Sequence, residues 1–307
     1  MAEITAGMVK DLREKTGVGM MDCKAALAAT SGDMDAAVDW LRAKGLAKAA
    51  KKSTRVAAEG LVGLAVAGTT GAVVEVNSET DFVARNEKFQ AMVAEISKLA
   101  LAAGGDSEKL KVMKFPGSQH AVAEYVAEMV ATIGENMTVR RTASLTVKDG
   151  VIGSYIHNQA APGMGKIGVL VALEGAGKKD ELAQFGRLLA MHVAATNPVA
   201  MDIAGVPPET LAREKAILEE KNAGKPPQVM EKIVASGLKT YAKENCLLEQ
   251  PYVHDGAKTV TQALAEAGTR SGAPVKLTGY VRLQLGEGIE KKDDDFAAEV
   301  AKAASGG

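Results

Sequence analysis

The sequence predicts an α+β fold, because short apolar runs typical of strands alternate with longer stretches whose apolar residues recur at helical spacing. Residues 72–76 form the clearest strand, since Gly71 precedes them and a polar cluster follows. The clearest helix lies within residues 87–100, and its apolar stripe consists of Phe89, Met92, Val93, Ile96 and Leu99. An internal repeat shows that this unit of strand and helix occurs twice. We therefore expect two small antiparallel sheets, each covered by a helix on one face.

Residues 1–55 are predicted to form a head of three short helices and a basic linker. Thr5 is a candidate N-cap for the first helix, the second covers about residues 22–29, and Asp33 caps the third. A Lys-Gly pair predicts that the third helix ends at Gly45. The linker carries basic residues without an acidic one among them, namely Lys48, Lys51, Lys52 and Arg55. We expect it to be solvated and partly helical, with a nucleic-acid patch as the alternative.

The internal repeat defines the core of the chain. The strand segment Gly71-Ala72-Val73-Val74 returns as Gly168-Val169-Leu170-Val171, and the helix stripe Phe89, Met92, Val93, Ile96 returns as Phe185, Leu188, Leu189, His192. Each copy is predicted to be a β-hairpin followed by a helix, the first within residues 56–144 and the second within residues 145–285. A third strand for each sheet is expected from residues 138–147 and 275–285.

The two copies differ at the turn that joins strand and helix. The first copy has Glu79-Thr80-Asp81-Phe82 there, and the second has Gly175-Ala176-Gly177-Lys178-Lys179. Phe82 at a polar turn either folds back onto its own helix or projects beside Asp81 as a wedge that binds a partner. Features that both copies share belong to the scaffold, whereas a feature of one copy alone is a candidate for function. After this comparison, we regard the wedge interpretation and the alternative that Phe82 folds back onto its own helix as equally supported.

Two appendages complete the predicted architecture. Residues 207–221 and 228–235 are expected to be helices joined by a Gly-Lys-Pro-Pro turn, which makes an antiparallel hairpin inserted at about residues 205–236. The apolar residues of this hairpin exceed what two helices can hide between themselves, so either a second copy of the chain or its own core must cover them. Residues 286–307 are expected to form a strand exit and a short amphipathic helix, which packs on the chain or binds a partner.

The composition gives no sign of binding to nucleic acid or membranes. Lys and Arg number 37 and Asp and Glu 38, which leaves a net charge of −1, and aromatic residues make up only 4%. No apolar run approaches the ~20 residues of a membrane span, and the first residues do not resemble a secretory signal. Cys23 and Cys246 match no metal or redox spacing. We therefore expect a cytoplasmic protein without a bound metal and without direct contact to nucleic acid or membrane.

The sequence also lacks the motifs of common enzymes. It contains no Gly-x-x-x-x-Gly-Lys-Ser/Thr phosphate loop, and its four histidines are not at metal-ligand spacing. His192 aligns with the apolar Ile96 and is expected to be buried and hydrogen-bonded. His157 ends a strand beside a glycine-rich loop and is a candidate contact residue. We expect no enzyme activity and no cofactor, and we keep an adaptor that binds through its head and an enzyme hidden in the core as rivals.

With these features in hand, the chain resembles the elongation factor Ts family, the guanine-nucleotide exchange factors of elongation factor Tu. The strongest motif is Thr80-Asp81-Phe82-Val83-Ala84-Arg85-Asn86, and further motifs lie in residues 15–27, 133–136, 191–195, 286–291 and 295–300. Several separated motifs in the same order make the resemblance specific. One departure is the loop of residues 158–168, which is longer than in compact family members.

The resemblance implies a protein that acts on a GTPase without chemistry of its own. In the family, the acid and the aromatic that match Asp81 and Phe82 push between two helices of the GTPase, which disturbs its Mg²⁺ site and loosens GDP. The partner contacts carried over are Thr80, Asp81, Phe82 and Val83 at the wedge, Val18, Met20 and Met21 in the head, and His157. The head is similar to ubiquitin-associated domains, the helical hairpin matches the family's dimerisation region, and the C-terminal helix matches a further GTPase-binding module. The implied partner is elongation factor Tu, GDP-bound and nucleotide-free.

Overall fold

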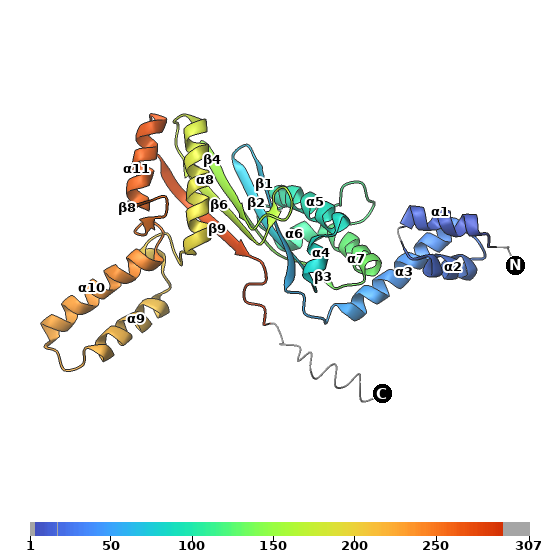
Figure 1. The fold of residues 1–307 in the computed structure, drawn as a ribbon, viewed down its shortest axis with the longest axis horizontal. Helices are drawn as coiled ribbons and strands as arrows, with labels where there is room; N and C mark the ends of the chain where they lie inside the picture. Colours follow the sequence, from blue (N-terminus) through green and yellow to red (C-terminus); the bar gives the residue numbers. More distant parts are fainter. Residues whose placement is uncertain (1–3, 17, 291–307) are drawn as a thin grey trace.

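The structure, a computed structural model that describes residues 4–16 and 18–290, has an α+β fold. Figure 1 shows a helical head at one end, two sheets in the middle and a helical hairpin at the other end. The head consists of α1 (Ala6–Thr16), α2 (Met20–Ala29) and the first part of α3 (Met34–Lys52). Its core is formed by Val9, Leu12, Cys23, Ala26, Leu27, Ala37 and Leu41. The three predicted helices of the head are therefore confirmed.

The two predicted N-caps of the head are present, but the third helix ends later than expected. Thr5 Oγ1 accepts a hydrogen bond from Met8 N–H at 3.3 Å, and the Asp33 carboxylate accepts one from Ala36 N–H at 2.9 Å. The prediction that α3 ends at Gly45 is wrong, because the helix continues to Lys52. A Cβ atom at Gly45 would lie 3.1 Å from the Ala131 side chain, so this glycine allows two helices to approach closely. The basic linker is therefore largely helical.

The core contains two antiparallel sheets, and their third strands lie where the sequence predicts them. The first sheet has the order β3-β2-β1-β5 and the second has the order β4-β6-β9. Their strands are β1 (Glu59–Ala67), β2 (Thr70–Ser78), β3 (Met137–Thr146), β4 (Gly150–His157), β5 (Met164–Gly165), β6 (Ile167–Glu174) and β9 (Lys276–Gln284). Within both sheets the second strand of each copy lies between the first and the third, so the repeat is also a repeat of topology.

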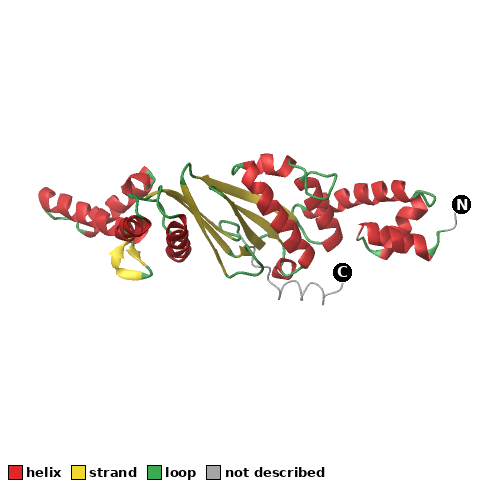
Figure 2. Ribbon diagram, turned by 90° about the horizontal axis from the view of Figure 1, so that it is seen from above, coloured by secondary structure: helices red, strands yellow, loops and turns green. Residues whose placement is uncertain are grey.

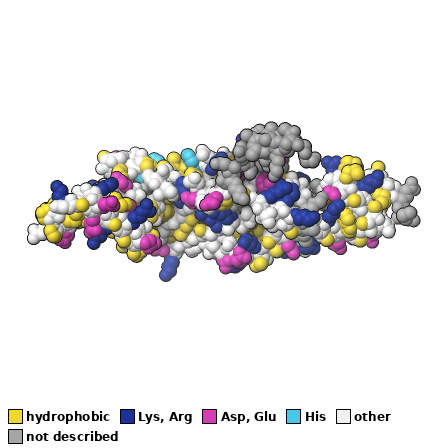
Figure 3. All heavy atoms as spheres, turned by 90° about the horizontal axis from the view of Figure 1, so that it is seen from below, with side chains coloured by type: hydrophobic (Ala, Val, Ile, Leu, Met, Phe, Trp, Pro, Cys, Tyr) yellow, Lys and Arg dark blue, Asp and Glu magenta, His cyan; other side chains and the backbone are white. Residues whose placement is uncertain are grey.

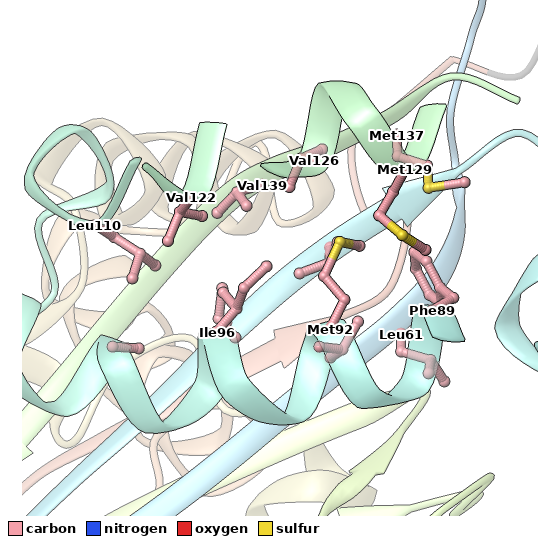
Figure 4. Close-up of a cluster of buried hydrophobic side chains, with 14 of the residues drawn as sticks. Leu61, Phe89, Met92, Ile96, Leu110, Val122, Val126, Met129, Met137 and Val139 are labelled. Atoms are coloured by element: carbon pink, nitrogen blue, oxygen red, sulfur yellow. The ribbon is translucent and has the colours of Figure 1, made fainter. Parts of the chain in front are cut away.

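Helices cover one face of each sheet, and the other two faces pack against each other (Figure 2). The first sheet is covered by α5 (Glu87–Ala103), α6 (Ser107–Val112) and α7 (Val122–Ile133), and the second by α8 (Lys179–Thr196), against which α11 (Val260–Ser271) packs. Figure 4 shows side chains of α5 and α7 pointing toward one another in the first core, among them Met92, Ile96 and Met129. The contact between the sheets contains Val62, Val73, Val147, Ile152, Leu170, Ala172 and Leu283.

Two details show that the copies share one backbone design. A β-bulge interrupts the pairing between Glu75 and Val76 in the first sheet and between Ala172 and Leu173 in the second, which are equivalent positions of the repeat. Gly71 and Gly168 are also equivalent, and each lies where the two sheets touch. An added Cβ would come within 2.7 Å of Ile152 Cγ2 at Gly71 and within 2.7 Å of Val62 Cγ1 at Gly168.

Part of the loop after His157 belongs to the first sheet, although the sequence predicts only a glycine-rich loop there. Met164 and Gly165 form the short strand β5, which pairs with β1 through Gly63 and Val62. Leu64 N–H donates a hydrogen bond to the Gly163 carbonyl at 2.9 Å, and Met164 is buried in the core of the first copy. A segment of the second copy thus completes the sheet of the first.

The helical hairpin projects from the second copy and is longer than predicted. It consists of α9 (Pro208–Lys221) and α10 (Pro227–Asn245), so its second helix continues well past Ala235. No residue of α9 is buried, and Ala242 near the base is the buried residue of α10. The short elements η1 (Ile203–Gly205), β7 (Pro251–Tyr252) and β8 (Asp255–Thr259) lie beside its base. The predicted C-terminal helix lies outside the described residues.

Candidate partner-binding site

The turn after β2 forms a short helix, α4 (Asp81–Ala84), in which one side chain is buried in the core and its neighbour is exposed. Val83 is 4% exposed and belongs to the core of the first copy, whereas the neighbouring Phe82 is 76% exposed. The alternative that Phe82 folds back onto its own helix is therefore wrong. Among the described residues, Phe82 is the one aromatic among the exposed large apolar side chains. An exposed aromatic on an anchored turn is suited to insertion into a partner.

The remaining contacts of α4 hold its end and leave the acid accessible. Gln90 Nε2 donates to the Ala84 carbonyl at 2.9 Å, and the Asn86 side chain caps the following helix at Phe89 N–H. Asp81 Oδ2 lies 3.4 Å from Arg85 Nη2, and both side chains are exposed. Exposed ion pairs of this kind contribute about 0–1 kcal/mol, so a partner can replace this one at little cost.

The start of α4 depends on a residue that the sequence analysis did not single out. Thr80 is the N-cap residue, but its side chain makes no cap hydrogen bond to the helix. Both its backbone N–H and its hydroxyl donate to the Glu135 carboxylate, at 2.9 and 2.7 Å. Glu135 is in the Ile133-Gly134-Glu135-Asn136 motif, yet nothing in the local pattern indicates its partner 55 residues earlier. The repeat offered one signal, because residues 175–179, which replace this turn in the second copy, contain no acidic residue.

The candidate residues of the head lie on a separate unit. Met20 and Met21 at the start of α2 are 54% and 78% exposed, whereas Val18 is half-buried against the head's core. A cavity of about 710 Å³ opens between the head and the core and is lined by Ala6, Lys10, Arg13, Glu14, Met20 and Lys88. Because Lys88 is the second residue of α5, the helix that follows α4, Met20 and the start of α5 border the same concavity. Figure 3 shows hydrophobic side chains exposed at the head end and also at the hairpin end.

The last candidate contact, His157, lies apart from α4 in the second copy. Its exposed side chain ends β4, and its Nδ1 lies 3.1 Å from the hydroxyl of Tyr155. Lys166 N–H donates to the His157 carbonyl at 3.1 Å, so the backbone is fixed where the long loop returns. The structure therefore brings Thr80, Asp81, Phe82 and Val83 together on one turn and distributes the other candidates over the head and the second sheet.

The buried histidine is fully hydrogen-bonded, as the repeat predicts. His192 Nε2 lies 3.0 Å from Gln250 Oε1, and its Nδ1 accepts from Val253 N–H at 3.2 Å. Burial holds the pKa of His192 below its ordinary value, although the Gln250 hydrogen bond acts in the opposite direction. Within the described part of the chain, no group of three His, Cys, Asp or Glu side chains could hold a metal ion. None of the described helices combines the length and apolar character that a membrane span needs.

Comparisons with known proteins agree with the motifs on which the candidate site rests. The family model described as elongation factor TS matches residues 79–287, from the residue before Thr80 to the turn after β9. The elongation factor Ts of Methylobacterium nodulans is 64% identical over 307 residues, which cover 100% of both chains. The elongation factor Ts of Xanthobacter autotrophicus is 59% identical over 304 residues, or 99% of each chain. This chain belongs to the elongation factor Ts family.

Proposed function

We propose that this chain binds elongation factor Tu and promotes the release of GDP, after which GTP reloads the GTPase. Asp81 and Phe82 enter the GTPase and disturb its Mg²⁺ and phosphate site. The observation that carries this proposal is the side chain of Phe82, which is 76% exposed beside the anchored Val83. Family membership gives the partner, because relatives along the whole chain are named elongation factor Ts.

The way a GTPase holds GDP makes a small displacement effective. Backbone donors surround the phosphates, and a Mg²⁺ ion bridges their oxygens. Mg²⁺ demands nearly octahedral coordination, so a modest shift of the groups around it weakens binding disproportionately. Thermodynamic linkage then requires that exchange factor and nucleotide weaken each other's binding by the same factor.

The wedge alone cannot supply the free energy that fast exchange needs, so further contacts with the GTPase are required. An acceleration of release by ~10⁴ corresponds to a barrier lower by about 5.5 kcal/mol. Burial of one Phe side chain supplies only ~1.5–3 kcal/mol. We therefore assign further contacts to Met20 and Met21 in a head of the ubiquitin-associated type, to His157, and to a C-terminal module in residues 286–307.

The helical hairpin is proposed to join two copies of the chain. Its apolar side chains are incompletely covered, since α9 has no buried residue and Val229 at the start of α10 is 42% exposed. The partly exposed apolar residues include Leu211, Ile217, Leu218, Met230, Ile233 and Val234. A second hairpin packed against these residues would remove them from water.

The test of the proposed function is the release of labelled GDP from purified elongation factor Tu, with and without this protein. We expect the protein to accelerate release in a manner that saturates with its concentration. Unchanged release together with binding to the GTPase would favour an adaptor. A chemical conversion that proceeds without any GTPase would favour an enzyme.

A further inference from the structure

A carboxylate from another part of the fold holds the first residue of the wedge turn. Glu135 accepts two hydrogen bonds from Thr80, one from the backbone N–H and one from the hydroxyl. Hydrogen bonds to an ionised acceptor are stronger than neutral ones, and two from one residue fix orientation as well as position. Thr80 precedes α4, so its orientation decides the direction in which the four-residue helix leaves the sheet.

A second carboxylate makes the reverse contact between the same two segments. Glu79 accepts from Asn136 N–H at 2.5 Å and lies 3.3 Å from Arg55 Nη1. The Asn136 side-chain amide in turn donates to the Arg55 carbonyl at 2.7 Å. Two adjacent residues of one segment are thus tied to two adjacent residues of the other, which opposes both sliding and rotation of the turn.

We propose that Glu135 is a positioning residue for nucleotide exchange. Its carboxylate holds Thr80 so that Phe82 already projects in the direction of insertion before the GTPase arrives. A turn that had to become ordered during binding would lose part of the contact free energy to conformational entropy. A side chain that must insert accurately works best when a second layer of hydrogen bonds supports it. This inference rests on the proposed function, because it assumes that Phe82 is the inserted group.

The second copy supports the assignment, because it has the same backbone turn without the carboxylate. The helices α7 and α11 each precede the third strand of their sheet, and each ends at a glycine, Gly134 with φ of +94° and Gly272 with φ of +86°. The residue that follows is Glu135 in the first copy and Ala273 in the second. In the second copy the residue before α8, Lys178, donates its N–H to a main-chain carbonyl, that of Ser271, at 2.9 Å. The carboxylate therefore occurs only in the copy that carries the exposed aromatic.

Four substitutions separate positioning from general stability. Glu135→Ala removes both acceptors, and we expect it to slow GDP release stimulated by the full chain by about 5- to 10-fold. Glu135→Gln keeps an acceptor for the Thr80 N–H, and its amide can donate to the hydroxyl, so we expect release within about 2-fold of wild type. Thr80→Val removes the hydroxyl and should slow release by about 2- to 3-fold, whereas Thr80→Ser should restore it. Glu95→Ala, at a partly exposed carboxylate paired with Lys98 on α5, is the matched control.

Amide hydrogen exchange of the free protein supplies a readout that does not depend on activity. Residues 80–85 should exchange faster in Glu135→Ala than in wild type and should recover protection in Glu135→Gln, while the amides of α5 stay protected in both. Faster exchange confined to this turn, together with slower GDP release, is the expected result. If Glu135→Ala lowers the melting temperature of the whole protein, the positioning role is tested by Thr80→Val and Thr80→Ser instead. Slower release by Thr80→Val and restored release by Thr80→Ser would then support it.

Failure of this inference can be told apart from failure of the proposed function. Wild-type release by Glu135→Ala and Thr80→Val, alongside slow release by Phe82→Ala, would overturn the positioning role and leave the wedge intact. Wild-type release by Phe82→Ala would overturn the wedge itself. Loss of release by Glu135→Gln equal to that of Glu135→Ala would also contradict the inference, because the amide retains the hydrogen bonds on which positioning depends.

Discussion

The two copies of the core share a backbone and differ in the polar groups that it carries. Both have the same strand order, an equivalent β-bulge and a helix that ends at a left-handed glycine. The first copy places carboxylates at three positions, Glu75, Glu79 and Glu135, in or beside its bulge and turn, whereas Ala172 and Ala273 occupy the equivalents of Glu75 and Glu135. The comparison teaches that apolar packing sets the fold in both copies, and that charged groups specialise one of them.

Glu75 is the clearest case, because it is a fully buried carboxylate where the second copy has a small apolar side chain. It accepts hydrogen bonds from Arg140 at 3.0 Å, Arg141 at 2.5 Å and the Asn77 amide at 3.0 Å. It also accepts from Gly286 N–H at 2.8 Å. Gly286 follows the last strand of the second sheet, so this one side chain joins the two copies.

The largest expected effect is the loss of this buried acceptor. Glu75→Ala leaves Arg140 and Arg141 without their main partner, and breaking a buried ion pair from one side costs about 3–5 kcal/mol. The free energy of unfolding, measured by denaturant titration, should fall by that amount. Glu95→Ala, at a partly exposed carboxylate on the same copy, should change it by no more than ~0.5 kcal/mol. Equal effects of the two substitutions would show that Glu75 is not a joint between the copies.

Protonation of Glu75 at low pH should cause part of the same loss of unfolding free energy. Burial by itself raises the pKa of Glu75, but hydrogen bonds from Gly286, Asn77 and Arg141 outweigh it, so the pKa lies below its ordinary value. A carboxylate with a lowered pKa contributes stability that is complete above its unfolded pKa and is lost as the pH falls through the folded pKa. Glu75→Gln should therefore flatten the acid limb of a plot of stability against pH. An unchanged acid limb would assign that limb to other groups.

Substitution of equivalent glycines should reduce the unfolding free energy by the same amount in both copies. Gly71→Ala and Gly168→Ala each add a Cβ within 2.7 Å of a side chain across the contact between the sheets. Overpacking of a core costs about 1–3 kcal/mol, and we expect the two losses of unfolding free energy to agree within ~0.5 kcal/mol. Gly256→Ala is the control, because nothing lies within 4 Å of its added Cβ. A loss confined to one copy would break the claim of a shared scaffold.

The smallest effect on folding is expected at the hairpin, which only the second copy carries. Ile217→Glu with Leu218→Glu places two charges on partly exposed apolar positions, and Leu218 also lies against Gly237 of α10. Because no residue of α9 is buried, any loss of structure should stay within the hairpin and leave the cores of the two sheets folded. The mass measured by light scattering should shift toward that of a single chain if the hairpin joins two copies. A mass that stays the same would mean that the hairpin does not mediate self-association.

Sequence patterns predicted the parts of this fold that depend on local periodicity. The strand of residues 72–76, the stripe of α5 and the buried His192 all follow from spacing and from the repeat. The end of α3 was mispredicted because Gly45 resembles a helix stop, whereas its contact with Ala131 depends on tertiary packing. The pairing of β5 with β1 and the bonds from Thr80 to Glu135 join distant segments, so no local pattern indicates them. Exposure of Phe82 was one of two open alternatives, and only the structure decided it.

The central claim is that Phe82 acts on exchange and not on folding. Its most direct test measures the melting temperature and the stimulated release of GDP on one sample of Phe82→Ala. We expect a melting temperature close to wild type, since the side chain is 76% exposed and surface changes usually stay within ~0.5 kcal/mol. Stimulated GDP release should slow by at least ~10-fold, which corresponds to about 1.4 kcal/mol of lost barrier lowering. Val112→Ala, at another exposed apolar side chain of the first copy, should leave both quantities unchanged. A marked fall in melting temperature with a proportionate loss of release would contradict the account, because Phe82 would then be a folding residue.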